Sequence, residues 1–232
     1  MNPVLVIGDR TYSSWSLRGW LLMALSGLDF DEEMHWLDAP NYKEGLLAAT
    51  GGGGGVPTVR LGSRIIADSM AIAEYAAEAA PDAGLWPKDP LDRAEARSLA
   101  AQMHSGFAAL RKACPMNLSN RFPDFVPDDA VKADLARLEQ LWLPCLERSG
   151  GPFLFGAFGA VDAFFAPVAT RIDTFCLPVS PTARAYADAI LDHPLMRQWI
   201  ADARLEADMA RDRTGRFSEG GFTPGDWPLL NR

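Results

Sequence analysis

The sequence predicts two domains of different class, an α/β domain followed by an all-helical domain. Short apolar runs alternate with helical periodicity over the first 79 residues, which is the signature of an α/β layer. A segment rich in Pro, Asp and Gly follows, and beyond it the pattern is helical with no strand-like alternation. We therefore predict domains over residues 1–80 and 93–232, joined by a linker over residues 81–92.

The first domain should have the element order βαβαββα. Apolar strand-like runs, helical stripes and turn residues set the expected boundaries. In chain order we expect a strand at Val4–Ile7, a helix ending near Gly27, a strand at Phe30–Leu37, a helix at Tyr42–Ala49, hairpin strands at 56–59 and 64–67, and a helix to Ala79.

Apolar residues with helical spacing mark the helices of the second domain. The stripes are Leu99, Met103, Phe107 and Leu110; then Val131, Leu135, Leu138, Trp142 and Cys145; then Val161, Phe165, Val168, Ile172 and Phe175. A last helix should begin at His193-Pro194, because proline suits the first helical position. The Gly- and Pro-rich tail from Thr214 to Arg232 should be irregular, with Phe217, Phe222 and Trp227 packing back in part.

Charge and composition exclude several function classes. The net charge of −8, without a cluster of Lys and Arg, disfavours a nucleic-acid partner. No apolar run approaches the roughly 18 residues that span a bilayer, and the start lacks the basic region of a signal peptide. Cys114, Cys145 and Cys176 are widely spaced, which argues against a disulfide framework, a zinc site or a dithiol centre. We expect a cytoplasmic protein without a metal.

Two short segments point to a peptide ligand. Val56-Pro57 stands at the start of an apolar strand, and Asp68-Ser69 opens the helix after the hairpin. Alone, the first could be a proline at a strand edge and the second an ordinary helix cap. A helix start also has free N–H groups for a carboxylate, and an acidic side chain suits an ammonium group. Together they suit the backbone and α-amino acid end of a small peptide.

The hydroxyl pair Ser13-Ser14 comes just before the first helix. Taken alone, the two residues would most simply cap that helix. The segments downstream favour a catalytic role instead.

The whole chain resembles the cytosolic glutathione S-transferase family. The residues that carry the resemblance are Tyr12 to Arg18, Val56-Pro57, Asp68-Ser69, Phe153 to Gly156 and Asp162. The resemblance implies a thioredoxin-like βαβαββα domain, an all-helical second domain, glutathione as co-substrate and a homodimer. Within the family, the first segment is most similar to the serine-type classes, especially zeta.

The resemblance also implies roles for individual residues. The active hydroxyl of such classes commonly lies five residues before the helix arginine, which selects Ser13 relative to Arg18, with Ser14 as the near alternative. Val56, before a proline whose bond is usually cis, would bind the cysteinyl part of glutathione. Asp68 and Ser69 would bind its γ-glutamyl end.

The sequence departs from the family pattern at two places. Gly51 to Gly55 stand where members often have a Lys or Gln for the glycine carboxylate of glutathione. Gly159 replaces the Ser or Thr that usually pairs with Asp162 in a capping box. The second change weakens the cap, because glycine is only a moderate N-cap residue.

The chemistry expected of these residues is activation of the glutathione thiol. A free thiol has a pKa near 8.5, and the thiolate is the nucleophile. A hydrogen bond from Ser13 and the positive end of the first helix would both favour the anion. The products would come from thiolate addition to, or displacement on, a small electrophile.

The acceptor should sit against the second domain. Helical spacing places His104, Phe107 and Arg111 on one helix face, and Trp15 would form an apolar wall. Arg111 could meet a carboxylate, or it could pair with a nearby acid at the surface. Two alternatives to a transferase remain open: a zeta-like cis-trans isomerase of maleyl-type acids, and a non-catalytic interaction protein of the same fold.

Overall fold

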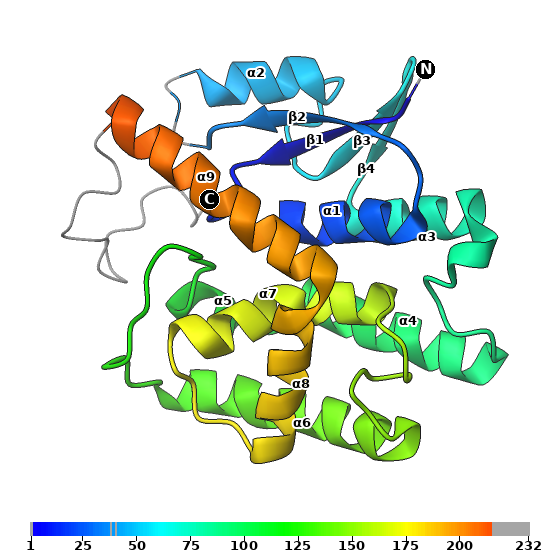
Figure 1. Cartoon of the computed structure of the whole chain (residues 1–232), viewed down its shortest axis with the longest axis vertical. Coiled ribbons are helices and arrows are strands. Elements are labelled where there is room, and N and C mark those ends of the chain that lie inside the picture. The colour runs from blue at the N-terminus through cyan, green and yellow to red at the C-terminus, as the bar shows by residue number, and fades with distance from the viewer. Residues whose placement is uncertain (1, 38, 40, 215–232) are drawn as a thin grey trace.

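The computed structural model describes residues 2–37, 39 and 41–214, with side chains to residue 209. A four-stranded sheet and its helices form one layer system, and a body of helices lies beneath it (Figure 1). The strands are β1 (Val4–Gly8), β2 (Asp31–His35), β3 (Thr58–Leu61) and β4 (Arg64–Ala67). The helices of this part are α1 (Ser14–Ser26), α2 (Tyr42–Ala49) and α3 (Ser69–Ala79). The predicted order βαβαββα and the fold class are confirmed.

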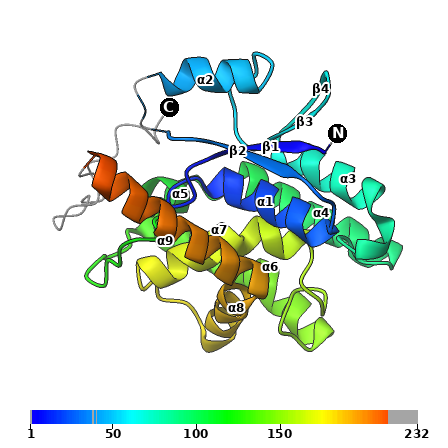
Figure 2. The ribbon, with the colours of Figure 1, turned by 45° about the horizontal axis from the view of Figure 1, so that its top comes forward.

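The sheet has the order β2-β1-β3-β4, with β1 parallel to β2 and antiparallel to β3. β1 is central, so its residues Leu5 to Ile7 are fully buried. α1 and α3 cover the face toward the helical body, and α2 covers the other face (Figure 2). β1 is an inner strand of the sheet. The turn that follows it therefore lies at the boundary between the sheet and the helical body.

Two strand boundaries differ from the prediction. β2 ends at His35, so Trp36 lies outside it. β3 begins at Thr58 rather than Val56, because Pro57 has no N–H to offer the ladder. The Val56-Pro57 bond is cis, as the resemblance implied.

The helical body follows a short 3₁₀ turn, η1 (Pro81–Ala83). Its helices are α4 (Pro90–Ser105), α5 (Ala108–Ala113), α6 (Asp129–Ser149), α7 (Ala160–Thr174), α8 (Pro181–Asp192) and α9 (Pro194–Thr214). α4 begins inside the segment predicted as a linker, and α9 begins at the predicted proline. No helix among the described residues is long and apolar enough to cross a membrane.

α7 is the central helix of this body and packs against α1, α4 and α8. Its side chains are buried almost throughout, which explains why its sequence is apolar on every side. The expected cap is present, since the Asp162 carboxylate accepts a hydrogen bond from the Gly159 N–H at 2.9 Å. The predicted tail lies, apart from Thr214, outside the described residues.

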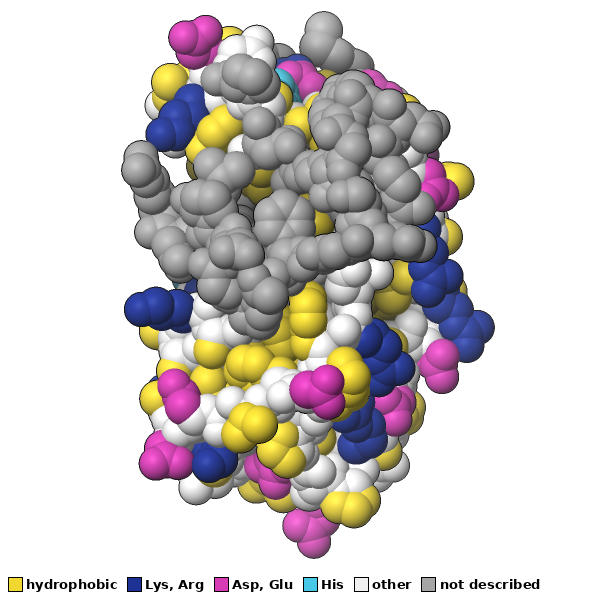
Figure 3. Space-filling view, turned by 90° about the vertical axis from the view of Figure 1, so that its left-hand side faces the viewer, with side chains coloured by type: hydrophobic (Ala, Val, Ile, Leu, Met, Phe, Trp, Pro, Cys, Tyr) yellow, Lys and Arg dark blue, Asp and Glu magenta, His cyan; other side chains and the backbone are white. Residues whose placement is uncertain are grey.

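α9 leaves the helical body and runs along the sheet-bearing part beside α1 (Figure 1). On the side of the molecule shown in Figure 3, acidic and basic side chains are interspersed, with apolar side chains between them. Through its contact with α1, α9 connects the helical body to the region of the turn after β1.

Candidate active site

The two serines lie at the start of α1, where the chain turns out of β1. Ser13 is the N-cap residue: its Oγ accepts from the Ser16 N–H at 3.3 Å and donates to the Ser16 Oγ at 2.7 Å. The Ser16 Oγ in turn accepts from the Gly8 N–H at 2.9 Å. The capping interpretation of Ser13 therefore holds, and it ties the helix start to the end of the central strand.

Ser14 differs from Ser13 in its surroundings. Ser13 is 5% exposed, whereas Ser14 is half-buried. Within the described chain the Ser14 hydroxyl has no hydrogen-bond partner, while its backbone N–H donates to the Tyr12 carbonyl at 3.0 Å. Ser14 could therefore donate to a ligand without breaking an existing bond.

A cavity of about 380 Å³ borders both serines and lies between the two parts of the molecule. Its lining residues are Tyr12, Ser13, Ser14, Trp15, Leu37, Tyr42, Val56, Arg111, Pro115, Met116 and Arg171. The serines and Val56 come from the sheet side, and the arginines come from the helical side. A larger hollow of about 770 Å³ lies between α7, α8 and α9, but none of its lining residues belongs to the predicted site.

Val56 and Pro57 are held against α1 by close packing. A Cβ on Gly19 would lie 2.4 Å from the Pro57 Cβ, which is closer than real atoms approach. Glycine at this position of α1 is therefore what lets the cis bond lie under the helix. The consequence is that Val56 reaches the cavity beside the serines.

Asp68 and Ser69 lie at the start of α3 and do not border this cavity. Asp68 caps α3 through its Oδ1, which accepts from the Met70 N–H at 2.7 Å, and its φ is +78°. Its Oδ2 lies 3.1 Å from the His104 Nε2, and the buried Ser69 Oγ lies 3.5 Å from the His104 Nδ1. Such a φ is strained for a residue with a side chain, and strained residues cluster at ligand sites.

Trp15 connects the Asp68 region to the cavity. Its ring lies between the guanidinium groups of Arg18 and Arg111, at 4.5 and 4.8 Å from the ring centre. The His104 ring meets it edge-on at 5.1 Å. The tryptophan therefore forms one wall of the cavity and makes cation–π contacts with two arginines.

Three arginines gather at this wall, and among the described residues none forms an ion pair. Arg18 is buried and donates from Nε to the Phe164 carbonyl at 2.9 Å, while its second terminal nitrogen is buried without a partner. Arg171 is also buried and donates to the carbonyls of Cys114 and Pro167 at 2.7 and 2.9 Å.

Burial and mutual repulsion lower the affinity of these groups for their protons. Burial, with smaller contributions from Arg111 and Arg171, holds the pKa of Arg18 well below its usual value. Burial, followed by repulsion from Arg111, lowers the pKa of Arg171 to about 10. The helical side of the cavity is electropositive, because Arg111 and Arg171 line it and neither forms an ion pair among the described residues.

The structure corrects the predicted single helix face. α4 ends at Ser105 and α5 begins at Ala108, because Gly106 is extended and Phe107 has a φ of +60°. A Cβ on Gly106 would lie 2.7 Å from the Gln102 carbonyl oxygen, so this turn suits glycine.

The chain reversal brings Arg111 back over the end of α4. Arg111 donates to the carbonyls of Met103 and His104, the second at 2.9 Å, and so caps α4 rather than pairing with an acid. Phe107 is 2% exposed, lies under the Arg137 guanidinium and does not border the cavity.

Arg171 is a cavity residue that the sequence did not assign to the site. It closely follows the apolar run 163–169 in α7, and a cation there was the available signal. Leu37 and Tyr42 carried no signal of their own. Groups of three or more side chains suited to a metal ion are absent from the described part of the chain.

Comparison with known proteins relates this part of the chain to a protein family. Residues 12–79 match the glutathione S-transferase N-terminal domain. This part of the chain therefore has the sequence pattern of a glutathione S-transferase N-terminal domain. The match includes both serines, Val56-Pro57 and Asp68-Ser69, and it confirms the family recognised from the sequence, while the serine-type assignment is not tested by it.

Two curated relatives carry a more specific name. A probable maleylacetoacetate isomerase from Caenorhabditis elegans is 29% identical over 200 residues, covering 83% of this chain and 90% of the relative. Maleylacetoacetate isomerase from Pseudomonas aeruginosa is 27% identical over 197 residues, covering 82% and 91%. The likeness therefore extends through both parts of the chain.

Solved structures of glutathione transferases share the fold. A homologue from Burkholderia gl BGR1 with bound glutathione has a TM-score of 0.65 at 24% identity, covering 88% of this chain and 98% of its own. A tau-class enzyme from mango, Mangifera indica, has a TM-score of 0.67 at 19% identity, covering 90% and 97%. At these identities the comparison establishes the fold alone.

Proposed function

We propose that this protein is a glutathione-dependent enzyme that activates the thiol of glutathione at the Ser13-Ser14 turn. The observation that carries the proposal is the cavity itself, which joins both hydroxyls and Val56 to an electropositive wall. Two relatives named as isomerases and a family match over residues 12–79 support it. The general activity would be thiolate transfer to a small electrophile.

In this proposal Val56 holds the cysteinyl backbone, and Asp68 with Ser69 holds the γ-glutamyl group. The thiol then lies beside the start of α1, where the helix dipole and a serine hydroxyl favour the thiolate. Asp68 is 52% exposed on its side chain, so an incoming ammonium group can reach it next to His104. The glycine carboxylate is assigned no side chain, because Gly51 to Gly55 offer only backbone groups.

Ser14 is the better placed hydroxyl for the thiolate, although Ser13 remains the residue that the family spacing selects. Ser13 would have to turn from the Ser16 Oγ to donate to sulfur, whereas Ser14 has no bond to give up. Hydrogen bonds to charged groups contribute about 1.5–3 kcal/mol, which corresponds to roughly 10- to 100-fold in rate.

Separate alanine variants distinguish the two serines. Ser14→Ala should lower kcat by about 10- to 100-fold and leave the free energy of unfolding nearly unchanged. Ser13→Ala should destabilise the protein by about 1 kcal/mol, since it removes an N-cap. Steady-state kinetics with glutathione and a neutral electrophile, beside urea unfolding, measure both. Full activity in both variants would exclude a serine-activated thiolate.

A second candidate function, glutathione-dependent cis-trans isomerisation of a maleyl-type acid, is favoured by the arginines. The thiolate would add to one alkene carbon, and the π electrons would move to the conjugated carbonyl oxygen as an enolate. Rotation about the new single bond and expulsion of the thiolate would then give the trans acid and return glutathione unchanged. Arg111 and Arg171 line the cavity with positive charge where a carboxylate or enolate would lie.

One assay separates these functions from the third, a non-catalytic interaction protein. Isomerase activity needs glutathione only in catalytic amount, while transferase activity consumes one glutathione for each acceptor. Binding alone is measured by thermal unfolding, because glutathione at about 100 times its Kd should add about 2.7 kcal/mol of stability. Stabilisation without turnover of neutral or maleyl-type acceptors would support the interaction protein, and no stabilisation would remove glutathione from the proposal.

A further inference from the structure

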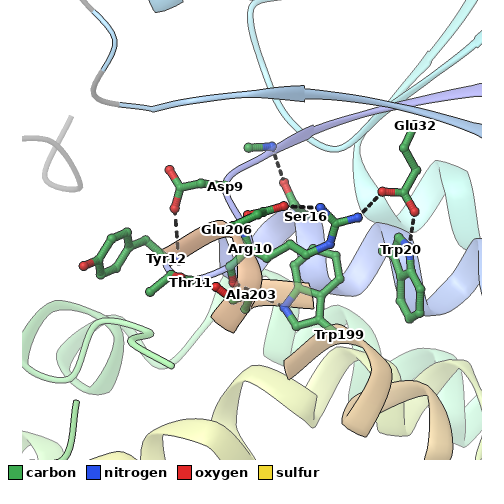
Figure 4. A network of polar contacts seen from close by, with 11 residues as sticks. Asp9, Arg10, Thr11, Tyr12, Ser16, Trp20, Glu32, Trp199, Ala203 and Glu206 are labelled. Carbon is green, nitrogen blue, oxygen red and sulfur yellow. Dashed lines mark hydrogen bonds and ion pairs between the residues drawn. The ribbon is translucent and has the colours of Figure 1, made fainter. Parts of the chain in front are cut away.

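The turn that carries the serines is held from outside by α9. This turn, residues 9–13, leaves β1 and enters α1, and α9 passes directly beside it (Figure 2). α9 belongs to the far end of the chain, so its contacts with the turn join residues almost 200 positions apart. Figure 4 shows these contacts from close by.

Both backbone groups of Arg10 are bonded to side chains of α9. The Arg10 N–H donates to the Glu206 Oε2 at 2.8 Å, and the Arg10 carbonyl accepts from the Trp199 Nε1 at 3.2 Å. One residue later, the Thr11 hydroxyl reaches the Ala203 carbonyl at 3.5 Å. The backbone of the turn is therefore held by α9 at Arg10, while the Thr11 carbonyl also accepts from the Leu118 N–H, after α5, at 3.3 Å.

The Arg10 side chain extends this link to β2. Its guanidinium group bridges the carboxylates of Glu206 on α9 and Glu32 on β2, and it lies over the Trp199 ring at 5.2 Å. Glu32 also accepts from the Trp20 Nε1 of α1 at 2.6 Å. The Arg10 and Glu206 side chains are only 12% and 10% exposed, so water screens this pair little.

The same turn positions the serines through its own backbone. The Ser13 N–H donates to the Asp9 carbonyl at 3.0 Å, and the Tyr12 N–H donates to the Asp9 Oδ1 at 3.3 Å. Arg10 lies inside this hydrogen-bonded turn (Figure 4). A shift of the Arg10 backbone would therefore move Ser13 and Ser14 relative to Val56 across the cavity.

We propose that Glu206, with Trp199, is a positioning residue for the serine turn, so that the docking of α9 sets the activity of the thiolate site. This inference rests on the proposed function. Glu206 does not border the cavity, and it acts through Arg10, whose backbone N–H and guanidinium group it both contacts.

Glu139 offers a matched control for Glu206. Its Oε1 also accepts a backbone N–H from a distant segment, that of Ser180, at 2.6 Å, but it lies in the helical body far along the chain from the turn. Glu139→Ala and Glu206→Ala each remove a bond to a distant backbone N–H, and Glu206→Ala also removes the ion pair with Arg10. Only Glu206→Ala should change the position of the two serines.

The experiment uses the full chain with glutathione and records kcat, KM and the apparent pKa of the bound thiol from its thiolate absorbance. We expect Glu206→Ala to lower kcat by about 10-fold or more, since small misplacements of reacting groups have such effects. We also expect a higher thiol pKa and a KM for glutathione within about 2-fold of wild type. Glu139→Ala should leave the thiol pKa and kcat unchanged.

A second pair of variants guards against misfolding of Glu206→Ala. Trp199→Phe keeps an aromatic ring but removes the indole N–H that donates to the Arg10 carbonyl. Trp142→Phe is the control, because it removes a buried indole N–H that has no hydrogen-bond partner among the described residues. The first should raise the thiol pKa and the second should not. A wild-type thiol pKa in Trp199→Phe and in folded Glu206→Ala would overturn the inference. A wild-type protein without bound thiolate would instead overturn the proposed function.

Discussion

Two buried polar clusters in this protein differ in how completely their groups are paired. Asp162, at the start of α7, is fully buried, and its carboxylate accepts from the Gly159 N–H, the Leu154 N–H and the Tyr186 hydroxyl. Arg18 and Arg171, farther along α1 and α7, are almost as buried, yet they bond only to carbonyl groups.

The difference distinguishes a cluster that stabilises the fold from a cluster that can bind a ligand. Buried polar groups are normally satisfied, so a cluster with unpartnered nitrogens and uncompensated charge needs another explanation. Arg18 and Arg111 each keep a buried nitrogen without a partner, and Arg111 and Arg171 face the cavity. The Asp162 cluster is complete within the chain, whereas no carboxylate of the described residues forms an ion pair with the three arginines.

The largest effect should follow from breaking the complete cluster. Asp162→Ala should lower the free energy of unfolding by about 3–5 kcal/mol, because it leaves the Tyr186 hydroxyl and two backbone N–H groups unpaired in the interior. Urea unfolding measures the loss. Asp128→Ala is the control: it removes the N-cap of α6, which accepts from the Val131 N–H, and should cost only about 1 kcal/mol. Equal losses in the two variants would contradict the comparison.

The charge of Asp162 should give the same cluster a pH dependence. Burial raises the pKa of Asp162 to about 6, although its hydrogen bonds act in the opposite direction. The folded state therefore holds the proton more tightly than the unfolded state, and the stability from this group is complete below about pH 4. It is lost as the pH rises through 6.

Unfolding of wild type and Asp162→Asn from pH 4 to 7 tests this sign. The free-energy difference, wild type minus variant, should decrease as the pH rises. A difference that grows with pH would show that the hydrogen bonds to the carboxylate outweigh its burial.

Removing a cation from the incomplete cluster should affect activity more than stability. Arg171→Met loses two bonds to carbonyls but relieves burial and repulsion, so the free energy of unfolding should change by less than about 1 kcal/mol. kcat/KM should fall by about 10-fold for an anionic acceptor, as expected for a lost charged hydrogen bond, and stay within about 2-fold for a neutral one. Arg121→Met, which breaks the exposed Arg121–Asp173 pair, is the control and should change neither ratio.

The smallest effect is expected where the cluster meets solvent. His104→Gln removes the partner of Asp68, whose ion pair is 26% and 52% exposed, so the free energy of unfolding should change by less than about 1 kcal/mol. KM for glutathione should change while kcat stays near wild type. Arg97→Gln breaks another ion pair between the same two helices, Arg97–Glu74, and should leave both constants unchanged. An altered kcat in His104→Gln would place His104 closer to the reacting atoms than the proposal does.

Local patterns determined the elements of this protein. Val4 to Ile7 is apolar because β1 is central, Gly27 ends α1 in a left-handed conformation, and Pro194 begins α9 as expected. The cap at Asp162 could also be predicted, since it depends on residues only three positions apart. These features need no knowledge of distant contacts, which is why the sequence alone was sufficient.

The sequence also determined which residues could belong to the site, but not how they meet. Family spacing pointed to Ser13, and the structure shows its hydroxyl bonded to Ser16, while the Ser14 hydroxyl has no hydrogen-bond partner among the described residues. Periodicity placed Phe107 beside Arg111 on one helix, but Gly106 breaks that helix and turns Phe107 into the core. Helical spacing cannot detect such a break, because it depends on a single backbone turn.

Only the tertiary structure decided that Arg111 of α5 lies over the Trp15 ring of α1, and that Glu206 holds the turn before the serines. These pairs are far apart along the chain, so no local pattern relates them. Their burial gives them their chemical character, because a charge acts strongly only where water is excluded. The sequence thus determined the parts of the fold, and packing between distant segments determined what those parts can bind.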